Sequence, residues 1–257
     1  QVKGATNVAD DYYVRYDGDT QLWTECARPE TPTTIDSSTM PQGLVRNADM
    51  SFTLKPLDWD DRDVGDEDSN PEPSFVGATI NDIFFYRNRL GFISGENVIL
   101  SRSASFFNFW FASVVDMQDT DPIDLAVSHN SVSILYHAVP FDEELLLFSN
   151  DTQFLLRADG VLSPKNCSIT EVTEFTCNPY VRPVGAGRRV YFPTERAEFT
   201  TIKEYFTIED TTNLKDAQDV TSHVPSFIPN GVYKIVSSNT ENVLGFFTLG
   251  AESKVYI

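Results

Sequence analysis

The sequence is poor in cysteine, and this scarcity argues against two kinds of stabilising site. Its three cysteines, Cys26, Cys167 and Cys177, are an odd number and include no CxxC pair. A disulfide framework and a structural zinc site are therefore not expected. Reduced thiols in a protein synthesised in the cytoplasm fit the sequence better.

Histidine is equally scarce, and catalytic motifs are missing. His129, His137 and His223 are scattered and lack a spacing such as HExxH, so we expect structural or surface histidines. There is no GxSxG sequence, and Val184–Arg188 carries only half of a dinucleotide-binding fingerprint. The sequence predicts no enzyme and no catalytic, cofactor-binding or metal site.

Long apolar runs are also missing. No stretch approaches 18 apolar residues, and no basic segment followed by an apolar one opens the chain. We therefore expect no membrane anchor and no signal-directed export. The sequence begins without methionine and ends within an apparent strand, which predicts an internal segment of a longer protein.

Basic residues are few compared with acidic ones. The chain has 19 Lys and Arg against 38 Asp and Glu, giving a net charge of −19. A protein that binds duplex DNA usually has the opposite sign, because its affinity comes from neutralising phosphates. An acidic wall can instead keep a polyanion from adhering as it slides past.

The densest acidic stretch runs from Asp58 to Glu72, with eight acidic residues and only Arg62 as a base. A solvated acidic loop is one interpretation. A calcium loop is another, but the spacing of an EF-hand fails, since Arg62 or Gly65 falls at its fifth position. A surface facing a channel or a neighbouring subunit is the third, with the candidates Asp58, Asp60, Asp61, Asp63, Asp66, Glu67 and Asp68.

What the sequence does contain is a folded, strand-rich pattern. Apolar residues make up 41% of the chain and aromatic residues 12%. Residues 1–57 read as a small unit of two hairpins, Tyr12–Tyr16 with Leu22–Glu25 and Leu44–Arg46 with Ser51–Lys55. The acidic, proline-containing residues 58–73 predict a linking loop.

Residues 74–257 repeat a strand-turn-strand theme at a period near 50. The predicted reversals are Ser94–Asn97, Ser149–Thr152, Pro193–Arg196 and Gly250–Ser253, and apolar strands are predicted before them at Ile83–Tyr86, Val132–Tyr136 and Val232–Val236. About four strands per period is typical of propeller blades. We therefore expect an all-β fold of antiparallel, propeller-like blades, in which Ile83–Tyr86 and Leu145–Phe148 are covered on both faces.

Two further groups of residues have more than one interpretation. The aromatic cluster Phe106–Phe111 favours core packing over an exposed platform for a partner or a carbohydrate. Arg87, Arg89 and Arg102 are then expected at blade edges. Carboxylate pairs leave open a polysaccharide-binding or polysaccharide-hydrolysing propeller module, the candidates being Asp119 with Asp121, Asp142–Glu144, and Glu209 with Asp210.

Several unusual stretches resemble the nozzle proteins of short-tailed podophages, the tail tubular protein B family. They are INDIFFYRNRLGFISGENVILSR followed by FFNFW, DDYYVRYD, DPIDLAVS, AVPFDEELLLFS and TSHVPSFIPNGV. They occur in order and cover nearly the whole chain, although a complete nozzle protein is much longer.

The resemblance implies a structural role in the virion tail. In the family, copies form a ring, expected to be a hexamer, below an adaptor ring of tail tubular protein A. Tail fibre proteins are further expected partners. The genome passes through the ring's channel without specific binding. The resemblance also implies a propeller-like body and synthesis in the bacterial host cytoplasm.

Overall fold

Every regular element in the described part of the chain is a β-strand. The computed structural model describes residues 1–3, 11–130, 132–141, 143–208 and 215–257. Within these ranges the strands form three four-stranded sheets and three two-stranded hairpins, and every strand pair is antiparallel. The predicted all-β, antiparallel class is confirmed. The described part of the chain contains no helix with the length and apolar character needed to span a membrane.

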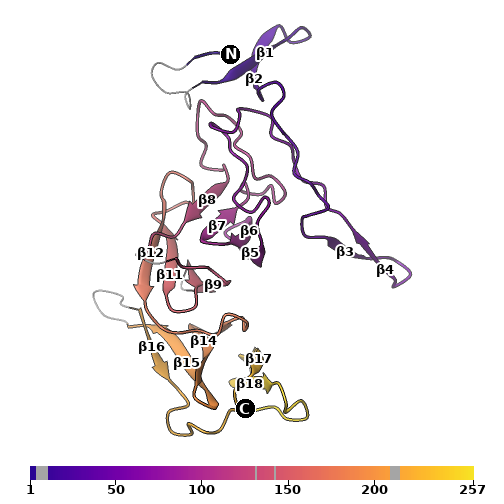
Figure 1. The fold of residues 1–257 in the computed structure, drawn as a ribbon. Coiled ribbons are helices and arrows are strands. Elements are labelled where there is room, and N and C mark those ends of the chain that lie inside the picture. Colours follow the sequence, from indigo (N-terminus) through magenta and orange to yellow (C-terminus); the bar gives the residue numbers. More distant parts are fainter. Residues whose placement is uncertain (4–10, 131, 142, 209–214) are drawn as a thin grey trace.

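Two hairpins precede the sheets, as the sequence predicts. The first pairs β1 (Tyr13–Asp17) with β2 (Leu22–Cys26), and the second pairs β3 (Gly43–Arg46) with β4 (Phe52–Lys55). The second hairpin, residues 43–55, is here called the arm. It projects sideways from the body of the molecule (Figure 1).

Each four-stranded sheet is a simple meander in which strands that follow each other in the sequence also pair. Sheet I contains β5 (Ile80–Tyr86), β6 (Arg89–Ser94), β7 (Asn97–Leu100) and β8 (Ile123–Ala126). Sheet II contains β9 (His137–Phe141), β10 (Glu144–Phe148), β11 (Gln153–Ala158) and β12 (Cys167–Thr173). Sheet III contains β13 (Val184–Ala186), β14 (Arg189–Arg196), β15 (Phe199–Thr207) and β16 (Lys215–Asp219). A last hairpin pairs β17 (Val232–Ser238) with β18 (Val243–Thr248).

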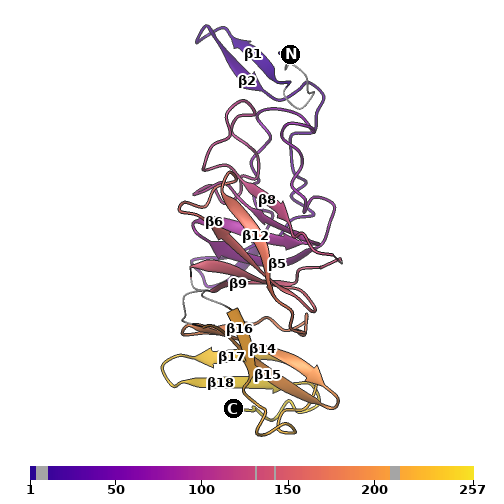
Figure 2. The same cartoon turned by 90° about the vertical axis from the view of Figure 1, so that its left-hand side faces the viewer.

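The sheets follow one another along the long axis of the molecule. Figures 1 and 2 show sheet I nearest the N-terminal hairpin, then sheet II, sheet III and the β17–β18 hairpin at the C-terminal end. Corresponding strands lie near each other: the first strands β5, β9, β13 and β17 form one series of neighbours, and the last strands β8, β12 and β16 form another. Successive meanders therefore stack face to face in the same orientation.

Strand β10 contributes side chains to two hydrophobic cores, one on each face of sheet II. Leu145 and Leu147 pack toward sheet I, whereas Leu146 and Phe148 pack toward sheet III, and all four side chains are fully buried. Side chains of a strand alternate between its two faces, so an uninterrupted apolar run is required where both faces are covered. The prediction that Leu145–Phe148 is covered on both faces is confirmed.

The same prediction is wrong for Ile83–Tyr86. Phe84 and Tyr86 are buried against sheet II, but Ile83 and Phe85 are 46% and 63% exposed. The layer covering the other face of sheet I packs mainly over β6 and β7, where its buried residues Met40, Phe75 and Phe109 cluster with Leu90, Phe92 and Ile99 of the sheet. This layer leaves the outer face of β5 open.

Three predicted segment boundaries also differ from the structure. Val132–Tyr136 is not a strand, because this segment crosses from sheet I to sheet II and β9 starts at His137. Pro193–Arg196 lies inside β14, and the chain reverses after it. Proline is tolerated at position 193 because β13 is too short to pair there. After Gly250–Ser253, Tyr256 makes only an isolated bridge with Phe246.

Candidate functional site

The acidic segment 58–72 contains no strand, yet it is fixed to the rest of the molecule. Arg62, Val64 and Asn70 are buried and Trp59 is half-buried, while the charged residues between them are exposed, with the exception of Asp66. The Asp60 backbone N–H donates to the Phe107 carbonyl (3.1 Å), and the Trp110 indole donates to the Asp60 carbonyl (2.9 Å). The backbone of the segment is therefore held in a defined position against the rest of the molecule.

Six of the seven candidate carboxylates are exposed on this surface: Asp58, Asp60, Asp61, Asp63, Glu67 and Asp68. Among the described residues, the carboxylates of this segment form no group of three ligand atoms close enough to share one cation. The segment presents concentrated negative charge to whatever lies beside it.

Asp66, the seventh candidate, is 3% exposed and shapes a turn. Its carboxylate accepts hydrogen bonds from the backbone N–H groups of Asp68 and Ser69 and from the Ser69 hydroxyl. Burial opposes ionisation of this carboxyl, but the hydrogen bonds outweigh it and lower the pKa of Asp66 below its ordinary value. The negative charge of Asp66 therefore stabilises the turn by accepting these hydrogen bonds and is not presented to the solvent.

The side chain of Arg62, the one base of the segment, is buried. Its side chain is 1% exposed and lies 4.5 Å from the centre of the Trp110 ring. Among the described residues, none of its three guanidinium nitrogens is hydrogen-bonded. Burial lowers the pKa of Arg62, with nearby acidic residues opposing that effect.

Exposed apolar side chains gather on the arm. Leu44, Met50, Phe52 and Leu54 are each more than 60% exposed. An isolated two-stranded hairpin is marginally stable in water. Because the arm buries little against its own chain, it is a candidate contact surface.

A second apolar surface lies on the open face of β5. Ile83 and Phe85 are joined there by Phe106, whose ring meets that of Phe85 edge to face with centroids 5.3 Å apart, while the half-exposed Phe107 packs against Trp59. In contrast, Phe109 and Trp110 are buried. The predicted core role of the Phe106–Phe111 cluster therefore holds for its second half, and its first half is partly exposed.

Among the carboxylates considered for polysaccharide hydrolysis, Asp121 and Glu144 form contacts within the fold. Asp121 is fully buried and accepts hydrogen bonds from the backbone of Ala112 and Gln118. Glu144 forms ion pairs with Arg157 and Lys215. Asp142, Glu209 and Asp210 lie outside the described residues.

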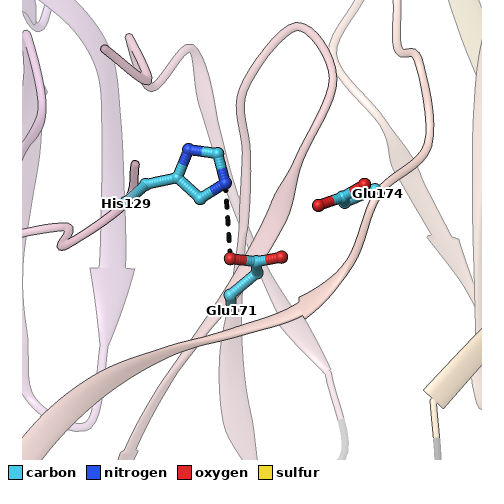
Figure 3. A group of neighbouring side chains, drawn as sticks. All are labelled: His129, Glu171 and Glu174. Carbon is cyan, nitrogen blue, oxygen red and sulfur yellow. Dashed lines mark ion pairs between the residues drawn. The ribbon is translucent and has the colours of Figure 1, made fainter. Parts of the chain in front are cut away.

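The three histidines occupy different environments. His223 is exposed. His137 is largely buried with Nε2 2.9 Å from the Pro179 carbonyl, and burial lowers its pKa, although Asp82 nearby opposes this effect. His129 lies beside Glu171 and Glu174, and in the described part of the chain this is the one group of three side chains placed to share a metal ion (Figure 3). Sequence spacing did not reveal this group, because Glu171 lies 42 positions after His129 in the chain.

Comparisons with known proteins identify the family of this chain. A family model described as bacteriophage nozzle protein matches residues 1–257. Tail tubular protein gp12 of Escherichia phage T7 is 49% identical over 256 residues, which cover 100% of this chain and 32% of that protein. The chain therefore spans about a third of the length of this relative. On both findings, the chain belongs to the bacteriophage nozzle protein family.

Proposed function

We propose that this chain forms part of the wall of a phage tail nozzle, a ring-shaped channel through which viral DNA passes into the host. The observation that carries the proposal is the 49% identity to a tail tubular protein along the complete chain. The fold suits a wall, because three stacked sheets share continuous apolar cores and each core joins neighbouring sheets. No catalytic step belongs to this role.

The three meanders are proposed to be blades of a propeller-like body spanning residues 74–257. Consecutive four-stranded meanders with neighbouring first strands support this architecture, since propeller blades place corresponding strands side by side. Residues 1–57 would then be a separate hairpin unit, and residues 58–73 the acidic connection between the two parts.

The acidic residues are proposed to act by repulsion. At −19 the chain repels a DNA polyanion, and a repulsive wall allows DNA to slide without adhering. Asp58, Asp60, Asp61, Asp63, Glu67 and Asp68 supply the densest exposed charge, and we place them on the channel or against a neighbouring subunit. Asp66 supports the turn that presents them.

The proposed partners are further copies of the protein in a hexameric ring, the adaptor ring of tail tubular protein A and tail fibre proteins. The arm, with its exposed Met50, Phe52 and Leu54, is the surface we assign to contact with a neighbouring copy. The assembly belongs to the virion tail after synthesis in the host cytoplasm.

Charge neutralisation tests the proposal. In phage carrying Asn or Gln at the six exposed positions, we expect DNA ejection in vitro to slow severalfold at low ionic strength, because DNA adheres to the less repulsive wall. Salt screens such forces beyond roughly 8 Å at 0.15 M, so the difference should shrink as salt is added. If the six acids face a subunit instead, ring assembly changes and ejection per assembled particle does not.

A matched control removes the same number of exposed charges elsewhere, using Asp116, Asp151, Asp159, Glu195, Glu198 and Glu241. The control phage should assemble and eject DNA at rates closer to those of wild type than the phage with the six substitutions in the acidic segment does. Equal behaviour of the two sets in assembly and in ejection would contradict the role assigned to the segment.

A further inference from the structure

We propose that His129, Glu171 and Glu174 bind a divalent transition-metal cation, with zinc as the best fit, at the junction of sheets I and II. Their ligand atoms all lie within 4.8 Å of one another, with His129 Nε2 3.3 Å from a Glu171 carboxylate oxygen (Figure 3). The site shares no residue with the acidic segment 58–72.

The backbone that carries His129 is anchored to sheet I. Beyond β8, the Val127 N–H donates to the Glu96 carbonyl (3.0 Å), and the Leu135 N–H donates to the Gly95 carbonyl (2.9 Å). The Glu96 carboxylate accepts from the Ser133 N–H (2.8 Å). These bonds hold both ends of the crossing segment against the β6–β7 turn, so His129 has a defined position.

Two contacts orient the His129 ring. Its Nδ1 lies 3.2 Å from the Ser133 hydroxyl, and the ring meets Phe154 edge to face with centroids 5.9 Å apart. When the hydroxyl accepts the Nδ1 proton, the lone pair on Nε2 points toward Glu171. A hydrogen bond of this kind on the second ring nitrogen is typical of metal-binding histidines.

An irregularity in β12 brings the two glutamates together. Glu171 pairs with Phe154, whereas Gln153 pairs with Thr173, so Val172 is an extra residue in β12. Residues three apart in a regular strand point to opposite faces. The extra residue changes this parity, and the Glu174 carboxylate joins that of Glu171. Bulges often redirect side chains in this way at functional positions.

Distances and ligand types favour zinc. With bonds of about 2.0–2.1 Å, the ligand atoms of a tetrahedral site lie about 3.3 Å apart, which matches His129 and Glu171. Glu174 is exposed, and its ligand atom lies within 4.8 Å of those of the other two residues. One imidazole with two carboxylates suits zinc better than calcium or magnesium, which prefer oxygen ligands alone. Glu171 is 39% exposed, so an ion and a water ligand can enter.

A bound cation would connect the crossing segment with β12, and therefore sheet I with sheet II. It would also neutralise the two carboxylates in a strongly acidic chain. Binding to the folded state alone stabilises a protein in proportion to the logarithm of ligand concentration over Kd.

Calorimetric titration of the untagged, full-length protein with ZnCl2 after chelator treatment tests the site. We expect one zinc per subunit at pH 7.5 and a raised melting temperature. His129→Asn and Glu171→Gln should each weaken binding at least tenfold.

The matched controls are His223→Asn and Glu195→Gln, exposed residues of the same types outside the group. Both should bind zinc as wild type does. The proposal is overturned if wild type takes up no zinc, if His129→Asn and Glu171→Gln bind it unchanged, or if the controls lose it equally. Circular dichroism of each variant without zinc shows whether a loss reflects misfolding, and a misfolded His129→Asn is replaced by His129→Gln.

Discussion

Replacing Arg89 by methionine is expected to lower the free energy of unfolding by about 3–5 kcal/mol, because it leaves several buried carbonyls without donors. Arg89 is 1% exposed. Its guanidinium donates to the carbonyls of Ser101 (2.7 Å), Asp121 (2.6 Å), Asp119 (2.9 Å) and Leu162 (3.1 Å). One side chain thus connects β6, the end of β7, the segment before β8 and the segment after β11.

Arg62→Met is the matched control for this prediction. Arg62 is equally buried, but among the described residues its guanidinium nitrogens make no hydrogen bond. Methionine removes the cost of burying the charge and loses a contact with Trp110 worth roughly 0.5–2 kcal/mol. We expect a net change within about 1 kcal/mol, of either sign.

Urea unfolding, with hydrogen exchange of the β6 and β7 amides to locate the effect, measures both variants in the full-length protein. Exchange should accelerate strongly in Arg89→Met and little in Arg62→Met. Equal losses from both substitutions would show that burial of the cation, and not its carbonyl contacts, determines the effect.

Asp82→Ala is expected to cost about 2–4 kcal/mol, because Asp82 joins the first strands of neighbouring sheets. Its carboxylate accepts from the Ala138 backbone N–H in β9 (2.9 Å) and pairs with Arg182, which precedes β13. Arg182 also donates to the Ala138 carbonyl (3.1 Å). The expected loss of unfolding free energy is smaller than for Arg89→Met, because Arg182 is half exposed and its charge is partly screened by solvent.

Two readouts separate this effect from a general loss of packing. The Ala138 amide should lose protection from hydrogen exchange in Asp82→Ala. The Asp82 charge raises the pKa of His137 against the larger effect of burial, so its removal should lower that pKa further. Asp159→Ala removes an exposed carboxylate and should leave stability and both readouts unchanged. An unaltered Ala138 amide in Asp82→Ala would contradict the connecting role.

The strands were the predictable part of this fold. Turn residues and apolar runs located both N-terminal hairpins, the strand Ile83–Tyr86 with the reversal Ser94–Asn97 in sheet I, and the buried run Leu145–Phe148. Coverage by distant residues was harder to predict, because a sequence pattern does not show how far a packing layer extends. Ile83 and Phe85 therefore appeared fully buried, and Arg89 was predicted at an edge although it lies between sheets.

For the candidate sites, too, the sequence predicted one part and only the structure shows the other. Charge density identified the segment from Asp58 to Glu72, but only the structure separates the turn-forming Asp66 from its exposed neighbours. The group of His129, Glu171 and Glu174 depends on a sheet crossing and on the extra residue Val172. Neither feature has a local signal in the sequence.

Electron cryomicroscopy of the assembled tail tests the central proposal most directly. We predict a closed ring in which sheets I, II and III form a continuous wall, the arm contacts a neighbouring copy, and the exposed acids between Asp58 and Asp68 line the bore or a subunit boundary. A ring that places those acids on its outer surface, away from both DNA and neighbouring subunits, would contradict this account.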